Sequence, residues 1–351
     1  MIYPIIQAPM AGGVTTPRLV AAVSNAGGMG SLGAAYMTAE QIREAVREIR
    51  RLSDHPFAVN LFAPESVPVL EEGALERANA ALEPFRAELG IPTPSTLRAP
   101  PESFEEQLAV VLEERVPVFS FTFGLPPQTW MRALKDRGVC IVGTATTVRE
   151  GRWLAESGVD ALVAQGSEAG GHRGSFSTTP EWALIGTMAL VPRLVDCVPV
   201  PVIAAGGIMD GRGIAAALAL GAAGVQLGTA FLRCPESAAH DSYKQVLRTH
   251  GEEEDTVLTR AFSGRVARGQ RNRFIAGMEQ RAGQLLPFPL QNALTRDIRQ
   301  AATSQGRPEF MALWRGQGPV RGETPPAAEL LAELVAETER VLGKLSLGLP
   351  G

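Results

Sequence analysis

One histidine of the chain lies in a segment whose composition suits contact with a ligand. His172 belongs to Gln165–Phe176, QGSEAGGHRGSF, which follows a short apolar run and also holds a carboxamide, Gln165, and a carboxylate, Glu168. A histidine flanked by glycines in a loop can reach a bound molecule, and its imidazole can take up or release a proton near neutral pH. We therefore predict a catalytic role for His172. A structural role is the alternative for any single histidine.

Two later loops carry glycines where a backbone could approach a phosphate. Val202–Asp210, VIAAGGIMD, and Val225–Ala230, VQLGTA, each begin as an apolar run and then reach glycine. Backbone N–H groups of loops at the mouth of a barrel bind phosphates, and glycine lets the main chain come close. A phosphorylated ligand or cofactor is therefore predicted, with simple tight turns as the alternative. The predicted contacts are Gly206, Gly207, Gly228 and Thr229.

A third glycine-rich segment has the letters of a dinucleotide-binding motif without its context. Gly28–Gly33, GMGSLG, matches G-x-G-x-x-G, which must follow a strand and open a helix. Here a helical pattern, Pro17–Ala26, precedes the motif, and Met29–Gly33 is itself strand-like. A Rossmann site is therefore not predicted. No Walker motif, HExxH, GxSxG or cluster of metal-ligand residues is present, so neither a hydrolase nor a metal site is predicted.

Five arginines crowd into Arg260–Arg273, RAFSGRVARGQRNR. A solvated surface segment is the simplest interpretation. Arginines placed over an active site could instead tie a cap to carboxylates of the barrel, or attract an anionic substrate. The sequence leaves these alternatives open.

Eight apolar runs alternate with helical patterns and must position these loops. Runs that are apolar on both faces are typical of buried parallel strands, and eight strand–helix pairs predict an α/β fold, a (β/α)8 TIM barrel. Several of the predicted helices end at glycine, as at Gly27 and Gly221. The predicted strands are Ile5–Ala8, Met29–Gly33, Phe57–Phe62, Val118–Phe123, Cys140–Gly143, Ala161–Ala164, Val202–Ala205 and Gly224–Leu227. The predicted barrel helices are Pro17–Ala26, Ala39–Leu52, Thr129–Asp136, Val148–Ser157, Pro180–Asp196 and Gly211–Leu220.

The remaining residues predict additions to the barrel. The barrel with its predicted phosphate site is expected over residues 1–235, with a helical insertion at about 64–117 after the third strand. Residues 236–325 are predicted to form a mostly helical cap that covers the substrate. Residues 326–351 are predicted to form a C-terminal helix that packs back on the barrel. The apolar side chains of Ala327–Leu342 could serve that packing or a homodimer.

Composition and charge limit the classes of partner. With 33 basic and 37 acidic residues, the net charge is −4, so nucleic-acid binding is not predicted. The chain has three cysteines and no CxxC pair, which favours a reducing compartment, and we predict a cytoplasmic protein. Gly213–Leu232 carries no charge, but its apolar character comes mostly from alanine and glycine, so no membrane span is predicted.

Several ordered motifs together resemble the nitronate monooxygenase family, formerly called 2-nitropropane dioxygenases. The resemblance runs along essentially the whole chain and implies a TIM barrel that binds FMN non-covalently. It also implies that O2 oxidises alkyl nitronates, with nitroalkanes as alternative substrates, to carbonyl compounds and nitrite through a flavin semiquinone. The matching segments are Ile6–Gly13 (IQAPMAGG), Ser24–Gly33 (SNAGGMGSLG), Pro56–Phe62 (PFAVNLF), Gln165–Phe176, Val202–Ile208, Val225–Ala230, Phe262–Phe274 (FSGRVARGQRNRF), Pro289–Thr295 (PLQNALT) and Leu313–Gln317 (LWRGQ).

The resemblance also implies roles for individual residues. His172 would orient and charge-stabilise the nitro oxygens, and could abstract the α-proton of a neutral nitroalkane. The residues expected against the isoalloxazine ring are Ala8, Pro9 and Met10, and those expected to hydrogen-bond the flavin are Asn60 and Gln165. The residues expected around the ribityl phosphate are Ala169, Gly170, Gly171, Gly206, Gly207, Gln226, Leu227, Gly228 and Thr229.

One departure and several alternatives accompany the resemblance. Members often have tyrosine where this chain has Phe288, which suggests a more apolar pocket here. An NAD(P)H-dependent flavin reductase, of the enoyl-acyl-carrier-protein or quinone reductase type, would share the barrel and its glycine loops. Arg173 after the histidine and the arginine-rich cap favour the monooxygenase. A flavin-binding protein without catalysis and a phosphosugar lyase or isomerase are the remaining alternatives.

Overall fold

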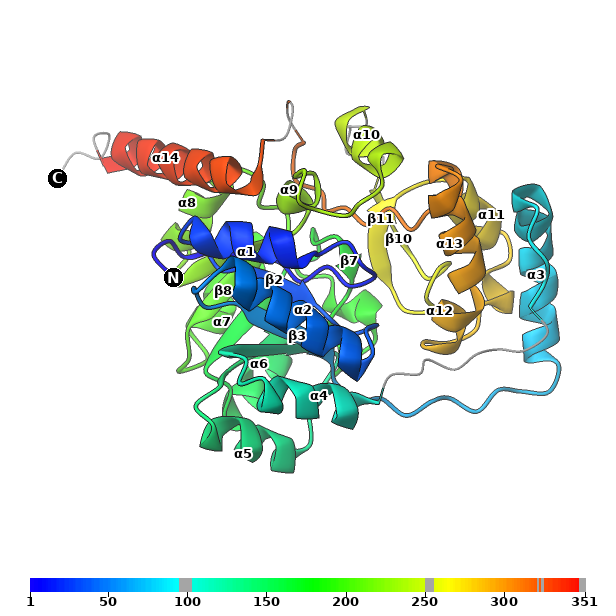
Figure 1. Cartoon of the computed structure of the whole chain (residues 1–351), viewed down its shortest axis with the longest axis horizontal. Helices are drawn as coiled ribbons and strands as arrows, with labels where there is room; N and C mark the ends of the chain where they lie inside the picture. The colour runs from blue at the N-terminus through cyan, green and yellow to red at the C-terminus, as the bar shows by residue number, and fades with distance from the viewer. Residues whose placement is uncertain (95–102, 250–255, 321, 323–324, 347–351) are drawn as a thin grey trace.

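Eight parallel strands form the centre of the molecule (Figure 1). The computed structural model describes residues 1–351 except 95–102, 250–255, 321, 323–324 and 347–351. The strand order is β1-β9-β8-β6-β5-β4-β3-β2, and a parallel bridge between Ile6 and Met29 brings the first and last strands together. The sheet is therefore a nearly closed barrel surrounded by helices, which confirms the predicted fold.

All eight predicted strands are present, with ends shifted by no more than two residues. The strands are β1 (Ile5–Gln7), β2 (Ser31–Gly33), β3 (Ala58–Phe62), β4 (Val118–Thr122), β5 (Cys140–Ala145), β6 (Ala161–Gln165), β8 (Val202–Ala205) and β9 (Gly224–Leu227). The helices around them are α1 (Pro17–Asn25), α2 (Ala39–Leu52), α4 (Phe104–Glu113), α5 (Gln128–Asp136), α6 (Val148–Glu156), α7 (Thr187–Val195), α8 (Gly211–Ala219) and α9 (Thr229–Leu232).

The seam between β1 and β2 is held by a buried side chain. Gln7 accepts a hydrogen bond from the backbone N–H of Ser31 at 3.1 Å and donates to its carbonyl at 3.2 Å. These are the bonds that a neighbouring strand would otherwise make. A side-chain amide therefore completes the barrel where the backbone ladder is reduced to one bridge.

The interior of the barrel is filled rather than hollow. Inward side chains from six strands form one apolar cluster: Ile6, Ala58, Val118, Val142, Val163, Ile203 and Ala205. A larger cluster packs the outside of the strands against the helices. A ligand must therefore bind at an end of the strands, where the loops are.

The helix predicted over Pro180–Asp196 is interrupted. The structure has a short 3-10 helix, η1 (Pro180–Ala183), and then α7. The carboxylate of Glu168 accepts the backbone N–H of Thr187 at 2.9 Å and also its hydroxyl at 2.9 Å. This bond satisfies the first turn of a new helix, so that α7 starts at Thr187.

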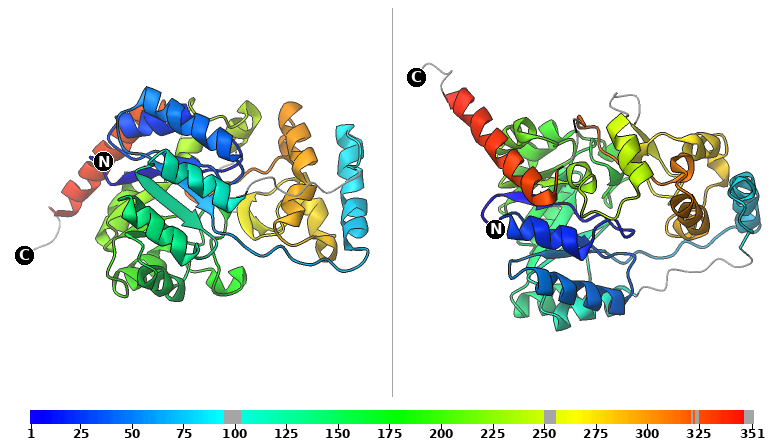
Figure 2. Two further views of the ribbon diagram at one scale, coloured as in Figure 1. Left: turned by 60° about the horizontal axis from the view of Figure 1, so that its bottom comes forward. Right: turned by 45° about the horizontal axis from the view of Figure 1, so that its top comes forward.

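The segment after β3 divides between the barrel and the cap. In α3 (Ala74–Leu89), Phe85 packs on Phe274 of the cap at 4.8 Å between ring centroids. Figures 1 and 2 show α3 beside the cap helices and away from the strands. By contrast, α4 packs on α2 and β3 as a helix of the barrel. Of the two insertion helices, only α3 leaves the barrel.

The cap contains a small sheet that the sequence patterns do not predict. Strands β10 (Thr256–Thr259) and β11 (Ala267–Gln270) pair with each other, and β11 pairs with β7 (Gly171–His172) of the barrel loop. Short strands with arginine and glycine inside them lack an alternating apolar pattern. The cap helices are α10 (Asp241–Thr249), α11 (Arg273–Glu279), η3 (Ala282–Gln284), α12 (Leu290–Leu294), α13 (Arg296–Ser304) and η4 (Pro308–Phe310).

The last helix lies on the barrel. In α14 (Ala327–Ser346), Ala327, Leu331 and Leu334 are buried in the main core, and the helix contacts α1 and α8 (Figure 2).

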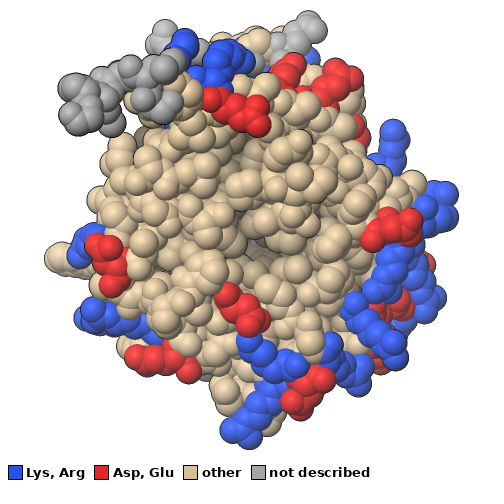
Figure 3. Space-filling view, turned by 90° about the vertical axis from the view of Figure 1, so that its left-hand side faces the viewer, with Lys and Arg blue, Asp and Glu red and all other residues tan. Residues whose placement is uncertain are grey.

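On the side of the molecule away from the cap, charged side chains lie around the edge and the centre is uncharged and hollowed (Figure 3). No helix within the described residues is long and apolar enough to cross a membrane.

Candidate active site

His172 lies between the barrel and the cap. It forms half of β7, and its backbone pairs with Ala267 of β11, so the cap sheet fixes the loop that carries it. Aromatic rings of both parts surround the imidazole, with centroids 5.6 to 6.3 Å away. These are Phe62, Phe123, Phe288 and Trp314. Phe288 therefore contributes an apolar ring at the position where a tyrosine would bring a hydroxyl.

A serine of the cap hydrogen-bonds one imidazole nitrogen of His172. His172 Nε2 lies 2.8 Å from the hydroxyl of Ser263, which is buried. That hydroxyl also lies 3.1 Å from the carbonyl of Arg265, to which it can donate its single proton. In that arrangement the hydroxyl accepts from Nε2–H, because it has no second proton to give, and Nδ1 is the proton acceptor. No residue in the described part of the chain donates to Nδ1.

The imidazole is uncharged at neutral pH. Burial, together with the smaller effects of the positive charges of Arg265 and Arg299, lowers the pKa of His172 to about 3. The charge stabilisation expected of His172 would need an imidazolium. In the structure, positive charge near the ring belongs to the two arginines.

The lowered pKa of His172 predicts a pH-dependent stability. An unfolded histidine titrates near pH 6.5, whereas the folded pKa is about 3, so between these values the unfolded chain binds a proton that the folded chain does not. The free energy of unfolding should therefore fall as the pH is lowered through this window. Urea unfolding at several pH values should show a smaller fall for His172→Asn than for the unsubstituted chain. Parallel curves for the two proteins would contradict this prediction.

Phe123 has an unusual backbone conformation at the end of β4. Its φ is 78°, a region that non-glycine residues rarely adopt. The guanidinium of Arg265 stacks on its ring at 3.8 Å, and Phe62 lies 4.4 Å away between centroids. The strained backbone therefore aims an aromatic ring at the histidine, and the cap holds it there. Nothing in the sequence marks this residue.

The arginine run ties the cap to the rest of the molecule, which is one of the alternatives that the sequence left open. Arg265 donates to Glu65 of the insertion at 2.7 Å, and Arg268 donates to the carbonyl of Ser167 at 2.9 Å. Arg273 pairs with Glu88 of α3 at 2.7 Å. Arg260, Arg265, Arg271 and Arg273 each form an ion pair with a carboxylate, so these charges are balanced within the protein.

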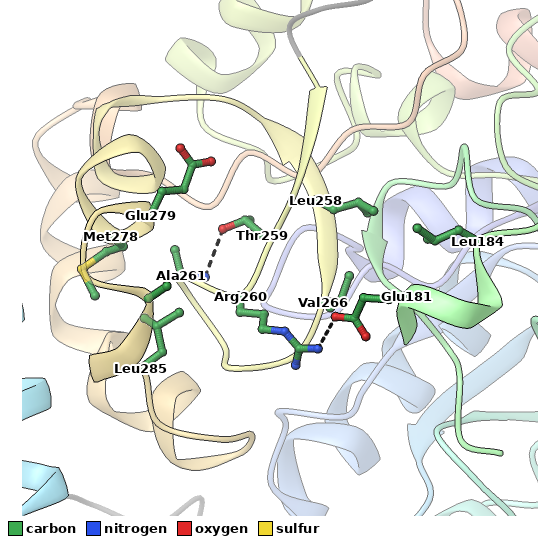
Figure 4. A pocket seen from close by; sticks show the side chains of 11 residues that line it. Glu181, Leu184, Leu258, Thr259, Arg260, Ala261, Val266, Met278, Glu279 and Leu285 are labelled. Atoms are coloured by element: carbon green, nitrogen blue, oxygen red, sulfur yellow. Dashed lines mark hydrogen bonds and ion pairs between the residues drawn. The ribbon is translucent and has the colours of Figure 1, made fainter. Parts of the chain in front are cut away.

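A cavity of about 330 Å³ lies beside one of these pairs, and His172 is not among the residues that line it (Figure 4). Arg260 and Glu181 join across it at 2.5 Å, and apolar side chains of the cap, including Leu258 and Val266, form its walls. None of the predicted flavin contacts lines this cavity. Its size alone does not connect it with the chemistry of His172.

Gln165 and Arg173 hold the histidine loop in place. The Gln165 side chain donates to the carbonyl of His172 at 3.0 Å and accepts from Gly174 N–H at 2.8 Å. The fully buried Arg173 donates to the carbonyls of Gly166 and Ala183. Burial lowers the pKa of Arg173 to about 10. The side-chain amide of Gln165 therefore already makes hydrogen bonds within the loop. The hydrogen bond predicted between Gln165 and the flavin would have to form in addition to these.

The predicted flavin contacts at β1 and β3 differ in how far they are exposed to solvent. Asn60 is 4% exposed and donates to Ser120 Oγ at 2.9 Å, and no described residue donates to its oxygen, which can accept from a ligand N–H. Ala8, Pro9 and Met10 are partly buried after β1. Thr15 fixes this loop, since its hydroxyl accepts from Met10 N–H at 3.0 Å.

The loops after β8 and β9 fit the predicted phosphate site. The two strands are neighbours, with Ala205 opposite Gln226, so their ends lie together. Among the described residues, no acceptor is bonded to the backbone N–H of Gly206, Gly207 or Gly228. Gly206 and Gly207 have φ of 110° and 74°, which aims successive amides without side-chain interference. Three unused donors in one place suit an anion such as a phosphate.

The histidine loop borders this cradle. A Cβ on Gly206 would lie 2.9 Å from the backbone nitrogen of Ala169, so Ala169 is directly beside it. Gly170 is packed against the main chain of Arg315, 2.5 Å from where its Cβ would be. Thr229 accepts the N–H of Gly316 at 3.0 Å. The phosphate contacts predicted for Ala169, Gly170, Gly171, Gly206, Gly207, Gln226, Leu227, Gly228 and Thr229 stay predictions.

Comparison with known proteins agrees with this geometry. The nitronate monooxygenase family model matches residues 1–337. A probable nitronate monooxygenase from Staphylococcus haemolyticus is 45% identical over 342 residues, covering 97% of this chain and 95% of the relative. The solved nitroalkane oxidase from Streptomyces ansochromogenes is similar with a TM-score of 0.91 and 41% identity, over 98% of this chain and 97% of that one.

A more distant structure shares the architecture. FabK from Thermotoga maritima is similar with a TM-score of 0.77 and 30% identity, over 99% of this chain and 96% of that one. Both its identity and its TM-score are below those of the nitroalkane oxidase. Since the family model covers the barrel, the cap and most of α14, the chain belongs to the nitronate monooxygenase family and is a flavin-dependent oxidoreductase.

Proposed function

We propose that this chain uses FMN and O2 to oxidise alkyl nitronates to carbonyl compounds and nitrite. The observation that carries the proposal is the pairing of three unused backbone donors, at Gly206, Gly207 and Gly228, with a neutral histidine at the same end of the barrel. The donors suit the phosphate of FMN rather than an uncharged flavin. The histidine suits a substrate that carries an acidic C–H or its conjugate anion.

Different residues would have different roles around the bound cofactor. The glycine loops would hold the phosphate, and Asn60 would accept a hydrogen bond from the flavin. When bound, FMN supplies the electron transfer that lets a carbanion react with O2, while the protein supplies orientation and electrostatics. His172 Nδ1 accepts a proton from a neutral nitroalkane, and Nε2–H stays on Ser263. Phe62, Phe123 and Phe288 keep water from the alkyl group.

The same proposal assigns roles to the parts of the chain. Residues 1–235 hold the cofactor, and 236–325 cover the substrate, with α3 of the insertion bound to the cap. The segment 326–351 completes the barrel surface, although residues 347–351 lie outside the described part. A homodimer remains a prediction.

Turnover by purified, FMN-loaded protein tests the proposal. Propyl-2-nitronate should give nitrite and acetone with consumption of O2, and NADH or NADPH should leave the flavin oxidised under anaerobic conditions. Rapid bleaching by NAD(P)H without nitrite release would instead support the flavin reductase. Binding of flavin without turnover of either substrate would support a protein that only binds the cofactor.

A further inference from the structure

A short segment near the end of the cap lies over the loops of the predicted phosphate site. It consists of residues 315–318, and we call it the strap. Gly316 donates its N–H to the hydroxyl of Thr229, which follows β9, at 3.0 Å. Gln317 donates to the carbonyl of Glu168, which follows β6, at 2.9 Å. Because β8 lies between β6 and β9 in the barrel, the strap spans the loop after β8.

The strap also touches the loop after β8 directly. A Cβ on Gly318 would lie 2.5 Å from the carbonyl oxygen of Gly207 and 2.5 Å from Met209 Cγ. No Cβ fits at such distances unless the neighbouring atoms move, so the two stretches of main chain can meet only because residue 318 is glycine. The strap therefore packs against the backbone whose N–H groups are predicted to bind the phosphate.

The strap brings two more hydrogen-bond donors to this place. Gly318 is buried, and no described residue accepts from its N–H. The buried hydroxyl of Thr229 accepts from Gly316, and no described residue accepts the proton of that hydroxyl. Gly318 lies beside Gly207 and Thr229 follows Gly228, and the N–H groups of Gly207 and Gly228 are unused as well. Buried donors nearly always have an acceptor, so a group of unused donors in one place indicates a ligand that accepts.

The N-terminus of α8, where barrels often bind a phosphate, is already occupied. Gly211 donates its N–H to the carboxylate of Glu337, on α14, at 2.9 Å. Arg212 and Gly213 donate theirs to the carboxylate of Asp210 at 3.0 and 3.2 Å. Two carboxylates at this helix end would repel an anion. The donors for a phosphate therefore come from the glycine loops and from the strap.

We propose that the strap completes the phosphate site of FMN. Gly318 donates its N–H to the phosphate. Gly316 is a positioning residue: it donates to the hydroxyl of Thr229 and so directs the proton of that hydroxyl away from the strap, towards the phosphate. The identification of the anion as the phosphate of FMN rests on the proposed function. The contacts of the strap and the occupied N-terminus of α8 do not depend on it.

FMN and riboflavin are the probes, because they differ only in the phosphate. Fluorescence titration of the flavin-free, full-length chain should show FMN binding at least about tenfold more tightly than riboflavin. In Gly318→Ala, the Kd for FMN should rise about tenfold or more, because the Cβ pushes the strap away from the carbonyl of Gly207. The Kd for riboflavin should change by less than about threefold. A general loss of structure would weaken the binding of both flavins equally.

Gly283→Ala is the matched control. Gly283 also lies in the cap and, like Gly318, has no positive φ, but no atom lies within 4 Å of where its Cβ would be. This variant should bind both flavins as the unsubstituted protein does.

Thr229→Val tests the hydroxyl that the strap positions. It keeps the branched shape of the side chain and removes the proton donor, so the Kd for FMN should rise about tenfold, the usual loss of a hydrogen bond to a charged group, with riboflavin binding unchanged. Thr229→Ser keeps the hydroxyl and should restore the affinity for FMN. These two variants decide the question if Gly318→Ala does not fold.

Two results would overturn the inference. One is an unsubstituted protein that binds riboflavin as tightly as FMN. The other is an unchanged ratio of the two Kd values in Gly318→Ala or, where that variant does not fold, in Thr229→Val. Nitrite release from a nitronate is a separate measurement. A protein that shows the expected ratios but releases no nitrite would refute the proposed function and leave the strap as part of the phosphate site.

Discussion

Replacing His172 by asparagine should lower kcat/KM for 2-nitropropane about 10²- to 10⁴-fold, the usual contribution of a positioned base. Nδ1 has no hydrogen-bond partner among the described residues and lies beside the aromatic rings, and asparagine has no basic nitrogen to replace it. Propyl-2-nitronate has already lost its α-proton. Its turnover should fall much less, by about tenfold, through the loss of one oriented polar group.

Initial rates with freshly dissolved 2-nitropropane and with pre-formed nitronate measure this difference. Because the pKa of His172 is about 3, the rate with nitroalkane should not fall between pH 8 and pH 5 through protonation of this ring. His240→Asn is the control, since that histidine bonds Ser242 within the cap. A His172→Asn protein that keeps its FMN and turns over nitronate undiminished would remove His172 from the mechanism.

Much of the fold follows from local patterns. The eight strands are short apolar runs between helix patterns, and both β8 and β9 have the predicted ends. These features depend on residues close in sequence, such as the hydroxyl of Thr38, which caps α2 through Gln41. The β10–β11–β7 sheet has no such pattern, because its strands are short and β7 comes from the histidine loop, far from β10 and β11 in the chain.

The candidate site likewise contains residues that the sequence reveals and residues that only the structure reveals. The glycine loops and His172 can be found from the sequence, since their residue types suit a ligand and each follows a strand. Ser263 and Phe123 cannot, because each gains its role from a partner far away in the chain. Ser263 meets a histidine 91 residues earlier, and Gln165 has a different use from the one predicted because its loop folds back on it.

Replacing Gly206 by alanine should weaken FMN binding about tenfold or more. At φ 110°, alanine is strained by about 1–3 kcal/mol, and its Cβ would lie 2.9 Å from the backbone nitrogen of Ala169. Main chain cannot move aside as a flexible side chain can, so the loop must shift and its free N–H groups lose their alignment. A loss of 1.4 kcal/mol of binding free energy corresponds to about a tenfold rise in Kd.

Gly158→Ala separates loss of the cradle from backbone strain in general. Gly158 has φ of 91° at the end of α6, and no atom lies within 4 Å of where its Cβ would be. Alanine there should cost about 1 kcal/mol of folding stability and leave the Kd for FMN unchanged. Fluorescence titration of the apoproteins with FMN measures the Kd of Gly206→Ala and of Gly158→Ala. Urea unfolding shows whether the two variants lose similar stability. If Gly206→Ala binds FMN as tightly as Gly158→Ala, the phosphate does not lie on the amides after β8. The three unused donors would then need another anion, and the role of FMN would depend on the flavin ring contacts alone.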